Sequence, residues 1–113
     1  MHELSLSNGM LEIIEKRAVE DGFDRVLVVR LEVGALSCVE RAALSFCFES
    51  VTRGSVAEGA HLDILDVAGK AWCWDCEAVV PLARRGEACG RCGGYQLKVR
   101  DGEQVRIKEL EVA

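Results

Sequence analysis

Four cysteines in two closely spaced pairs constrain this chain more than any other feature of its sequence. They occur as CWDC, with Cys73 and Cys76, and as CGRC, with Cys89 and Cys92, and twelve residues separate the two pairs. Two such pairs can place four thiolates at the corners of a tetrahedron, which is the ligand geometry of a structural zinc site. We therefore predict a four-cysteine zinc site.

Two other chemistries could use the same cysteines. Thioredoxin-type redox dithiols require a strand and a helix around the motif, and the glycine-rich segment around these pairs lacks that pattern. A tetrathiolate iron site stays open on ligand chemistry alone. About thirty residues cannot fold on apolar burial alone, so we expect the metal to hold residues 70–101 together in a structural role.

Two helices are predicted outside the cysteine segment. The first covers about residues 4–20, where apolar side chains recur at helical spacing before Asp21-Gly22. The second follows Ser37, because Ser37 and Glu40 have the spacing of a capping box. We expect its buried stripe to consist of Val39, Ala42, Ala43, Phe46, Cys47, Ser50 and Val51.

Three strands are predicted at residues 24–34, 60–68 and 103–112. In the first strand, side chains alternate between two faces with a period of two. The buried face is expected to consist of Leu27, Val29, Leu31 and Val33. In the last, the apolar pattern shifts by one residue, which a bulge near Lys108-Glu109 would explain.

The expected fold is therefore α+β, with two helices on a three-stranded sheet and a zinc ribbon inserted before the last strand. The predicted domains are residues 1–69 plus 102–113, and residues 70–101 for the ribbon.

Charge and hydropathy limit the function classes. The formal net charge is −5 with a pI near 5.0, whereas a nucleic-acid binder normally presents a basic face. Residues 70–101 carry six Lys or Arg against four Asp or Glu and contain no basic run. No apolar run approaches the roughly 18 residues that would span a bilayer, and no secretory signal is visible. We expect a cytoplasmic protein that binds neither nucleic acid nor membrane.

The N-terminus offers a second metal-binding pattern. The α-amine of Met1, the next backbone nitrogen and the imidazole of His2 can reach one ion in a plane, and the amide of Glu3 could supply a fourth donor. Square-planar nitrogen ligation suits Ni(II) or Cu(II) rather than zinc. A histidine at position 2 can also be accidental, but its bulk disfavours removal of Met1 and so preserves the spacing.

Three other candidates are given ordinary roles. Cys47 is expected to be a small buried hydrophobe, because it falls on the apolar stripe of the second helix. Cys38 lies at a helix start, where a thiol pKa can fall, but we expect no function for it. His61 is expected to be solvated or hydrogen-bonded rather than a ligand.

The whole chain resembles the HypA/HybF family of hydrogenase maturation proteins. The resemblance rests on MHELSL, LEVGALSCVE, LSFCFE, GSVAEGA, AWCWDC and CGRC, and it looks closest to the HybF-like branch. It implies a nickel metallochaperone rather than an enzyme. It also implies that Ni(II) is a transient cargo bound at Met1, His2 and Glu3, and that Zn(II) is structural at the four cysteines.

The same resemblance implies partners and one further residue. The partners would be the nickel-loading GTPase HypB and the large-subunit precursor of a [NiFe] hydrogenase, with urease accessory proteins in some organisms, and the chain itself would be a monomer or a weak homodimer. Glu40 matches an acidic residue that bears on the nickel site in the family. Many relatives have a histidine where this chain has Gly93, so a mechanism that uses ribbon histidines is in doubt here.

One alternative from another class remains. A zinc-ribbon adaptor for protein interaction or nucleic-acid binding would contain zinc alone, and it would be indifferent to what precedes Met1.

Overall fold

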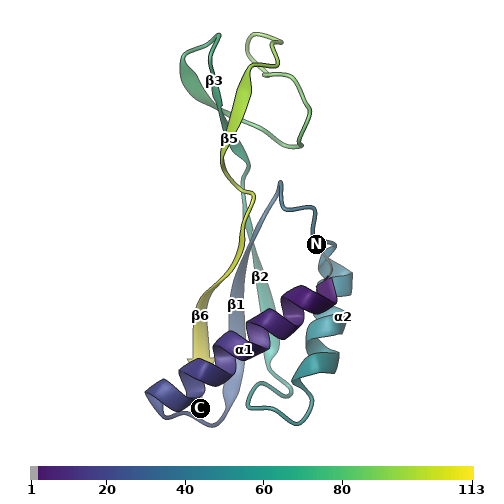
Figure 1. Cartoon of the computed structure of the whole chain (residues 1–113), viewed down its shortest axis with the longest axis vertical. Helices are drawn as coiled ribbons and strands as arrows, with labels where there is room; N and C mark the ends of the chain where they lie inside the picture. The colour runs from purple at the N-terminus through teal and green to yellow at the C-terminus, as the bar shows by residue number, and fades with distance from the viewer. Residues whose placement is uncertain (1–2) are drawn as a thin grey trace. The chain divides into compact units, whose positions relative to one another are not determined.

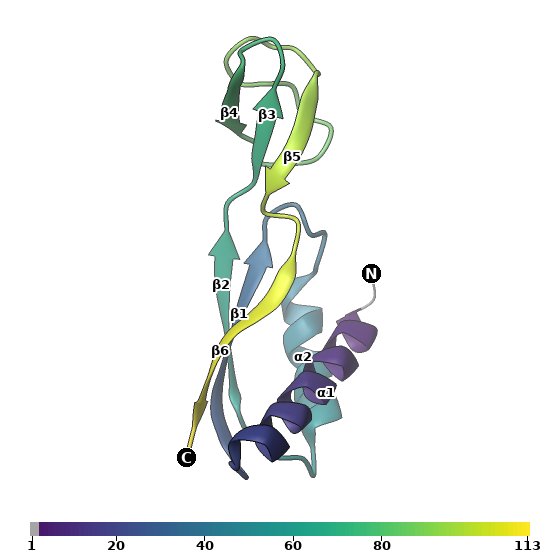
Figure 2. The same ribbon diagram turned by 60° about the vertical axis from the view of Figure 1, so that its left-hand side comes forward.

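The computed structural model describes residues 3–113, so the predicted nickel ligands Met1 and His2 lie outside the described residues. The elements follow the order α1 (Glu3–Asp21), β1 (Val26–Gly34), α2 (Arg41–Thr52), β2 (His61–Val67), β3 (Lys70–Cys73), β4 (Ala78–Pro81), β5 (Leu97–Asp101) and β6 (Val105–Val112). The strands form two sheets, with orders β2-β1-β6 and β4-β3-β5 (Figures 1 and 2). The predicted α+β fold, with two helices, a three-stranded sheet and a cysteine ribbon inserted before the last strand, is confirmed.

The chain divides into two compact units. The first contains the chain up to Leu31 together with Val39–Ile64 and Ile107–Ala113, and the second contains Glu32–Cys38 and Leu65–Arg106. The predicted ribbon, residues 70–101, falls inside the second unit. The predicted domain boundaries themselves stay a prediction. Neither helix of the described chain combines the length and the apolar character needed to cross a membrane.

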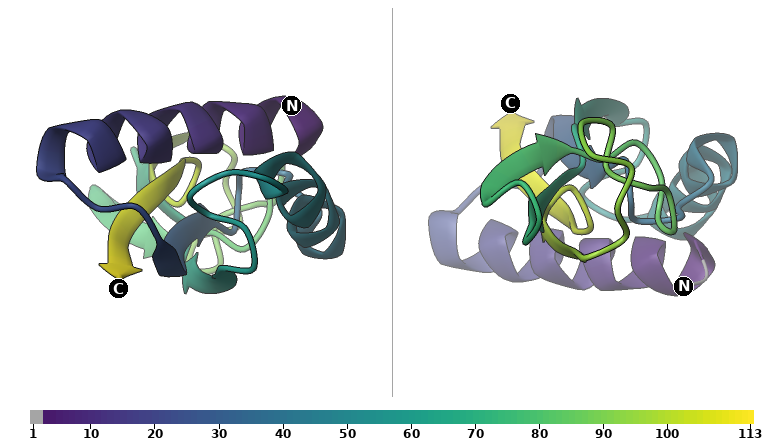
Figure 3. Two further views of the ribbon diagram at one scale, coloured as in Figure 1. Left: turned by 90° about the horizontal axis from the view of Figure 1, so that it is seen from below. Right: turned by 90° about the horizontal axis from the view of Figure 1, so that it is seen from above.

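The core of the first unit lies between the two helices and the sheet. Both helices lie on the same side of that unit's strands (Figures 2 and 3). Their buried side chains are Ser7, Met10, Ile14 and Ala18 from α1, and Leu44, Phe48 and Thr52 from α2. Val29 and Leu31 of β1 are buried as predicted, but at the start of that strand Val26 is buried and Leu27 is exposed, the reverse of the prediction.

The predicted stripe of α2 was right at Val39, which is buried just before the helix, and wrong at Phe46. Leu44 and Phe48 are buried, whereas Phe46 is 71% exposed. Apolar residues surround most of this helix, so helical spacing alone does not decide which face is buried. The structure buries the pair formed by the large Leu44 and Phe48 side chains.

The predicted capping box was also wrong in its position. Glu40, not Ser37, is the N-cap of α2, and its carboxylate accepts hydrogen bonds from the amides of Ala42 at 3.1 Å and Ala43 at 2.6 Å. Cys38 has φ 60°, which is not a helical conformation, so a helix cannot run from Ser37. The Ser37 hydroxyl instead donates to the Gly34 carbonyl at 2.7 Å.

The second unit contains two small hydrophobic clusters. One consists of Leu36, Ala71 and Leu82 with Leu97 and Val99 beside it. The other consists of Cys73, Val80 and Cys89 with Cys76 and Leu97 beside it. In the first cluster, Leu36 comes from the loop after β1, far from the ribbon in sequence.

Candidate metal centres

Each cysteine pair lies in a tight turn. Cys73 is the last residue of β3, which pairs with β4 on one side and with β5 on the other. The residue directly after the second cysteine has positive φ in both turns: Glu77 at 51° and Gly93 at 73°. This left-handed step costs little at Gly93, whereas Glu77 adopts it with a side chain.

The four sulfurs are spaced as zinc ligands. The Sγ atoms of Cys73 and Cys92 are 3.7 Å apart, those of Cys76 and Cys89 are 3.8 Å apart, and all four lie within 4.8 Å of one another. Tetrahedral ligation with Zn–S bonds of about 2.3 Å requires sulfurs about 3.8 Å apart. The four cysteines therefore fit a zinc ion, as the sequence predicted.

Backbone amides point at three of the sulfurs. The amides of Cys76, Arg91 and Gly94 donate to the sulfurs of Cys73, Cys89 and Cys92 respectively, each at 3.4 Å. Four thiolates around a divalent ion leave excess negative charge, which these amides stabilise. These donors cannot be predicted from the sequence, because they are main-chain groups whose direction depends on the turn.

Gly94 lies close to one of the ligands. A Cβ at this position would lie 2.6 Å from the carboxylate of Asp75 and 3.3 Å from the sulfur of Cys92. The exposed Asp75 side chain can turn away, so a larger residue would act on the site mainly by crowding the Cys92 sulfur.

The thiols differ in acidity. The pKa of Cys89 is lowered to about 7, mainly by the backbone amides of Cys92 and Arg91. The pKa of Cys76 is raised to about 12, first by its contact with the Cys92 thiol and then by desolvation. Without a cation, Cys89 thus ionises more readily than Cys76, which stays protonated, so a divalent ion must displace protons to gain its ligands.

We expect zinc affinity to fall as the pH falls and to fall more steeply below about pH 7. Above that pH, Cys89 is already ionised, whereas below it this thiol also takes up a proton that zinc must displace. Competition with a chelator at pH 8, 7 and 6 measures the effect. An affinity that stays constant over this range would contradict the assignment of thiolate ligands.

The start of α1 and the start of α2 are joined by a hydrogen bond. The backbone amide of Glu40 donates to Oε2 of Glu3 at 3.3 Å, and the Glu40 carboxylate caps α2. The structure thus brings together two of the residues predicted to bear on nickel. No local pattern predicts this contact, because the two residues are 37 positions apart.

Among the described residues, the remaining candidates have no partners with which to share a metal ion. Within residues 3–113, Cys73, Cys76, Cys89 and Cys92 are the one group of three or more potential ligand residues close enough to share a metal ion. Cys38 is exposed and Cys47 is half-buried on α2. His61 is exposed at the first residue of β2.

Comparisons with known proteins agree with this geometry. A family model described as "Hydrogenase/urease nickel incorporation, metallochaperone, hypA" matches residues 1–112. The chain is 49% identical over 112 residues to the hydrogenase maturation factor HypA of Azotobacter chroococcum mcd 1, covering 99% of both chains. It is 52% identical over 112 residues to the factor of the same name from Albidiferax ferrireducens, again covering 99% of both.

Solved structures show the same fold. The solution structure of the Ni metallochaperone HypA from Helicobacter pylori matches with a TM-score of 0.74 at 24% identity, covering 99% of this chain and 97% of that chain. A second solution structure of a HypA protein matches with a TM-score of 0.74 at 26% identity, covering 100% of this chain and 97% of the other.

Proposed function

Because this chain belongs to the HypA family of hydrogenase maturation factors, we propose that it is a nickel metallochaperone that binds one Ni(II) at Met1, His2 and Glu3 and delivers it for maturation of a [NiFe] hydrogenase. The nickel is cargo, and no catalysis is required. The four cysteines hold Zn(II) as a structural ion. Assignment to the HybF-like branch stays a prediction.

The position of Glu3 at the start of α1 supports this nickel site. The first four amides of a helix have no intrahelical acceptor. The Glu3 amide can therefore lose its proton and bind a metal without breaking a hydrogen bond of α1. This is the observation that carries the proposal most directly.

The bond between Glu3 and Glu40 gives the proposed site a fixed support. The side chain of Glu3 is held at the start of α2, so its backbone nitrogen has a defined position at the end of a folded helix. Glu40 acts through this contact and through its cap, which makes it a positioning residue rather than a ligand. The cap and the contact with Glu3 are both compatible with the role that the resemblance implies for Glu40, an acidic residue near the nickel site.

We propose the nickel-loading GTPase HypB and the hydrogenase large-subunit precursor as partners, with urease accessory proteins as further recipients in some organisms. Release to a partner would proceed by replacing the nitrogen ligands one at a time. Six cysteines with no disulfide between them suit the reducing cytoplasm, where we place this activity.

Nickel binding to three forms of the full chain tests the proposal. Equilibrium dialysis with elemental analysis should give one nickel per chain for the native N-terminus, and none for His2→Ala or for a form extended by a few residues before Met1. Both changes remove a required nitrogen from the ligand set. Zinc should stay at one per chain in all three forms, because the four cysteines are unchanged.

Equal nickel in the three forms, or none in any of them, would contradict the N-terminal site. The chain would then be better described as a zinc-ribbon adaptor. Exposed Trp74 and Tyr95 of the second unit would be the first residues to examine for that role.

A further inference from the structure

The small sheet β4-β3-β5 has an inner face that carries a zinc ligand and an outer face that does not (Figure 2). Successive side chains of a strand point to opposite faces. In β3, Ala71 and Cys73 are buried on the inner face, so Trp72 lies on the outer one. The residues paired with Lys70 and Trp72 share this outer face. We call it the cationic face, and its residues are Lys70, Trp72, Val79, Lys98, Arg100 and Asp101.

Two of the cations flank the Trp72 ring. The guanidinium carbon of Arg100 lies 5.7 Å from the centroid of this ring, which is within the range of a cation–π contact. Lys98 is paired directly with Trp72 between β5 and β3, and directly opposite residues have Cβ atoms about 4.5–5.5 Å apart. Both cations are exposed, so they can reach a ligand that lies over the ring.

The positive charge of the cationic face is not neutralised within the chain. Among residues 3–113, no carboxylate forms an ion pair with Lys70, Lys98 or Arg100. Asp101 lies opposite Lys70, but its Oδ1 accepts a hydrogen bond from the amide of Gly102 at 2.8 Å. The whole chain has a formal net charge of −5, so this concentration of cations is a local exception.

The zinc centre does not use these cations either. Its four thiolates carry excess negative charge, but the side chain of Cys73 lies on the inner face of β3, opposite Trp72. Backbone amides, not lysines or arginines, donate to the sulfurs of Cys73, Cys89 and Cys92. The three cations of the outer face thus remain available for a ligand.

The centre of the cationic face is apolar. Trp72 is half-buried, and Val79, its direct partner in β4, is 49% exposed. Protein interfaces commonly combine an apolar or aromatic centre with a polar rim, and tryptophan and arginine are enriched where binding energy concentrates. An apolar centre with a cationic rim is suited to a ligand that has both carboxylates and an apolar side chain.

We propose that the cationic face binds an acidic segment of a partner protein. Carboxylates of the segment pair with Lys98 and Arg100, and one of its apolar side chains covers Trp72 and Val79. Charge complementarity selects this occupant. Nucleic acid is disfavoured, because the rest of the chain is acidic and repels a phosphate backbone. The proposal does not depend on nickel binding.

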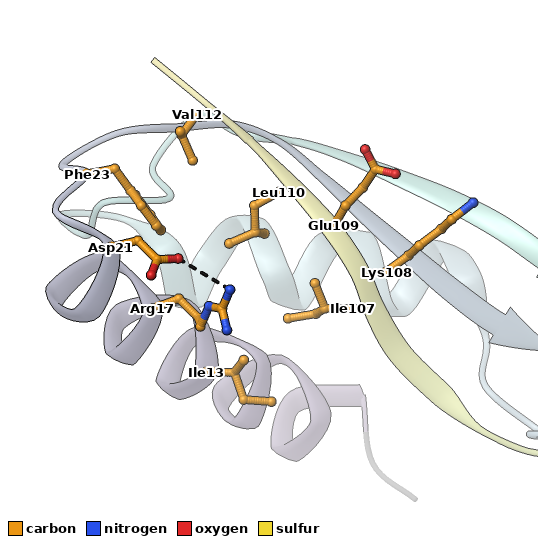
Figure 4. A pocket seen from close by; sticks show the side chains of 9 residues that line it. All are labelled: Ile13, Arg17, Asp21, Phe23, Ile107, Lys108, Glu109, Leu110 and Val112. Atoms are coloured by element: carbon orange, nitrogen blue, oxygen red, sulfur yellow. Dashed lines mark ion pairs between the residues drawn. The ribbon is translucent and has the colours of Figure 1, made fainter.

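The first unit provides a comparison. A groove of about 580 Å³ lies between α1 and β6, lined by several apolar side chains and by Lys108 (Figure 4). Lys108 is exposed and forms no ion pair within residues 3–113. However, Glu109 is its neighbour, and Arg17 in the same groove pairs with Asp21 at 3.3 Å. This groove has apolar surface without excess positive charge, so an acidic segment should not select it.

An acidic peptide tests the proposal. The probe is a fluorescent peptide with one leucine between two runs of three glutamates, and its anisotropy reports binding to the zinc-loaded full chain. Raising the ionic strength from about 20 mM to about 300 mM should weaken binding on the order of tenfold, because salt screens exposed charges. Replacing the leucine of the peptide by serine should weaken it on the order of threefold, through the lost apolar contact.

Charge reversal on the cationic face should weaken peptide binding. We expect Lys98→Glu and Arg100→Glu each to raise the dissociation constant on the order of tenfold, because an attractive contact becomes repulsive. Lys98→Gln should have a smaller effect. Lys108→Glu is the matched control, since it makes the same change of net charge at an exposed lysine of the first unit, and it should leave the affinity unchanged.

Two further measurements complete the test. Zinc content and circular dichroism of each variant should match those of the wild type, so that a loss of binding is not a loss of fold. A single-stranded oligodeoxynucleotide with the same charge as the peptide should bind more weakly than the peptide does.

Absence of binding at up to about 1 mM peptide and low ionic strength would overturn the proposal. An equal loss of affinity in Lys108→Glu would overturn it as well, since binding would then follow the net charge of the chain. Tighter binding of the oligonucleotide, weakened by Lys98→Glu, would assign the cationic face to nucleic acid instead.

Discussion

Replacing Cys73 by serine should abolish zinc binding and unfold the second unit. Cys73 is fully buried, packs against Val80 and Cys89, and contacts the Cys92 sulfur at 3.7 Å. The rest of this unit's core consists of a few small side chains, whereas a structural zinc site contributes on the order of 10 kcal/mol to folding. The folding free energy lost with one zinc ligand is therefore larger than the apolar clusters can supply.

The two tryptophans make this expectation simple to measure. Both Trp72 and Trp74 lie in the second unit, so the emission of the variant should shift to that of solvent-exposed indole. Zinc should fall from one per chain to near zero. Most of the helical circular dichroism should remain, because α1 and α2 belong to the first unit.

Cys47→Ser provides the matched control. Cys47 lies on α2 outside the sulfur cluster, so this variant should keep both its zinc and its native emission. Native emission and stoichiometric zinc in Cys73→Ser would show that three cysteines suffice, which contradicts a site that folds the unit.

The cysteine site was predictable because its geometry is local. A CxxC turn fixes its own backbone within four residues, so the spacing indicates the ligands without knowledge of the rest of the fold. The same holds for α1 and for the buried Val29 and Leu31 of β1, whose spacing follows one period. The left-handed backbone conformation at Glu77 could not be predicted, because a residue with a side chain rarely adopts positive φ.

The errors occurred where tertiary contacts decide between local alternatives. The start of α2 depends on the turn at residues 34–38, whose Leu36 amide donates to the carbonyl of Gly102 at 2.7 Å. Leu36 is buried against Ala71 and Leu82, and Arg85 donates to its carbonyl at 3.1 Å. No local pattern reports such contacts, so the turn appeared to be the first part of a helix.

Replacing Gly34 by alanine should strongly destabilise the second unit. A Cβ at this position would overlap the carbonyl oxygen of Gly102 and lie 2.9 Å from the backbone nitrogen of Glu103. Both are main-chain atoms. They cannot move without breaking neighbouring hydrogen bonds, such as the one from the Gly34 amide to the Gln104 carbonyl at 2.9 Å.

Gly102 offers no space in return. It has φ +87°, and a Cβ on it would lie 2.6 Å from the Cα of Gly69. The three glycines thus let three backbone segments of this unit approach more closely than side chains allow. We expect Gly34→Ala to lower the free energy of unfolding by about 3 kcal/mol or more, since an overpacked site bounded by main chain cannot relax by a rotamer change.

Gly9→Ala is the comparison that separates close packing from a general effect of glycine. Gly9 lies inside α1, and a Cβ there would meet no heavy atom within 4 Å. Alanine should therefore stabilise the chain by up to about 1 kcal/mol through helix propensity. Thermal unfolding of the zinc-loaded variants, followed by tryptophan emission and by circular dichroism, should shift in opposite directions for the two substitutions. A wild-type melting temperature for Gly34→Ala would mean that the backbones around Gly102 can separate without cost. The contacts of the turn at residues 34–38 with the rest of the second unit would then not stabilise that unit.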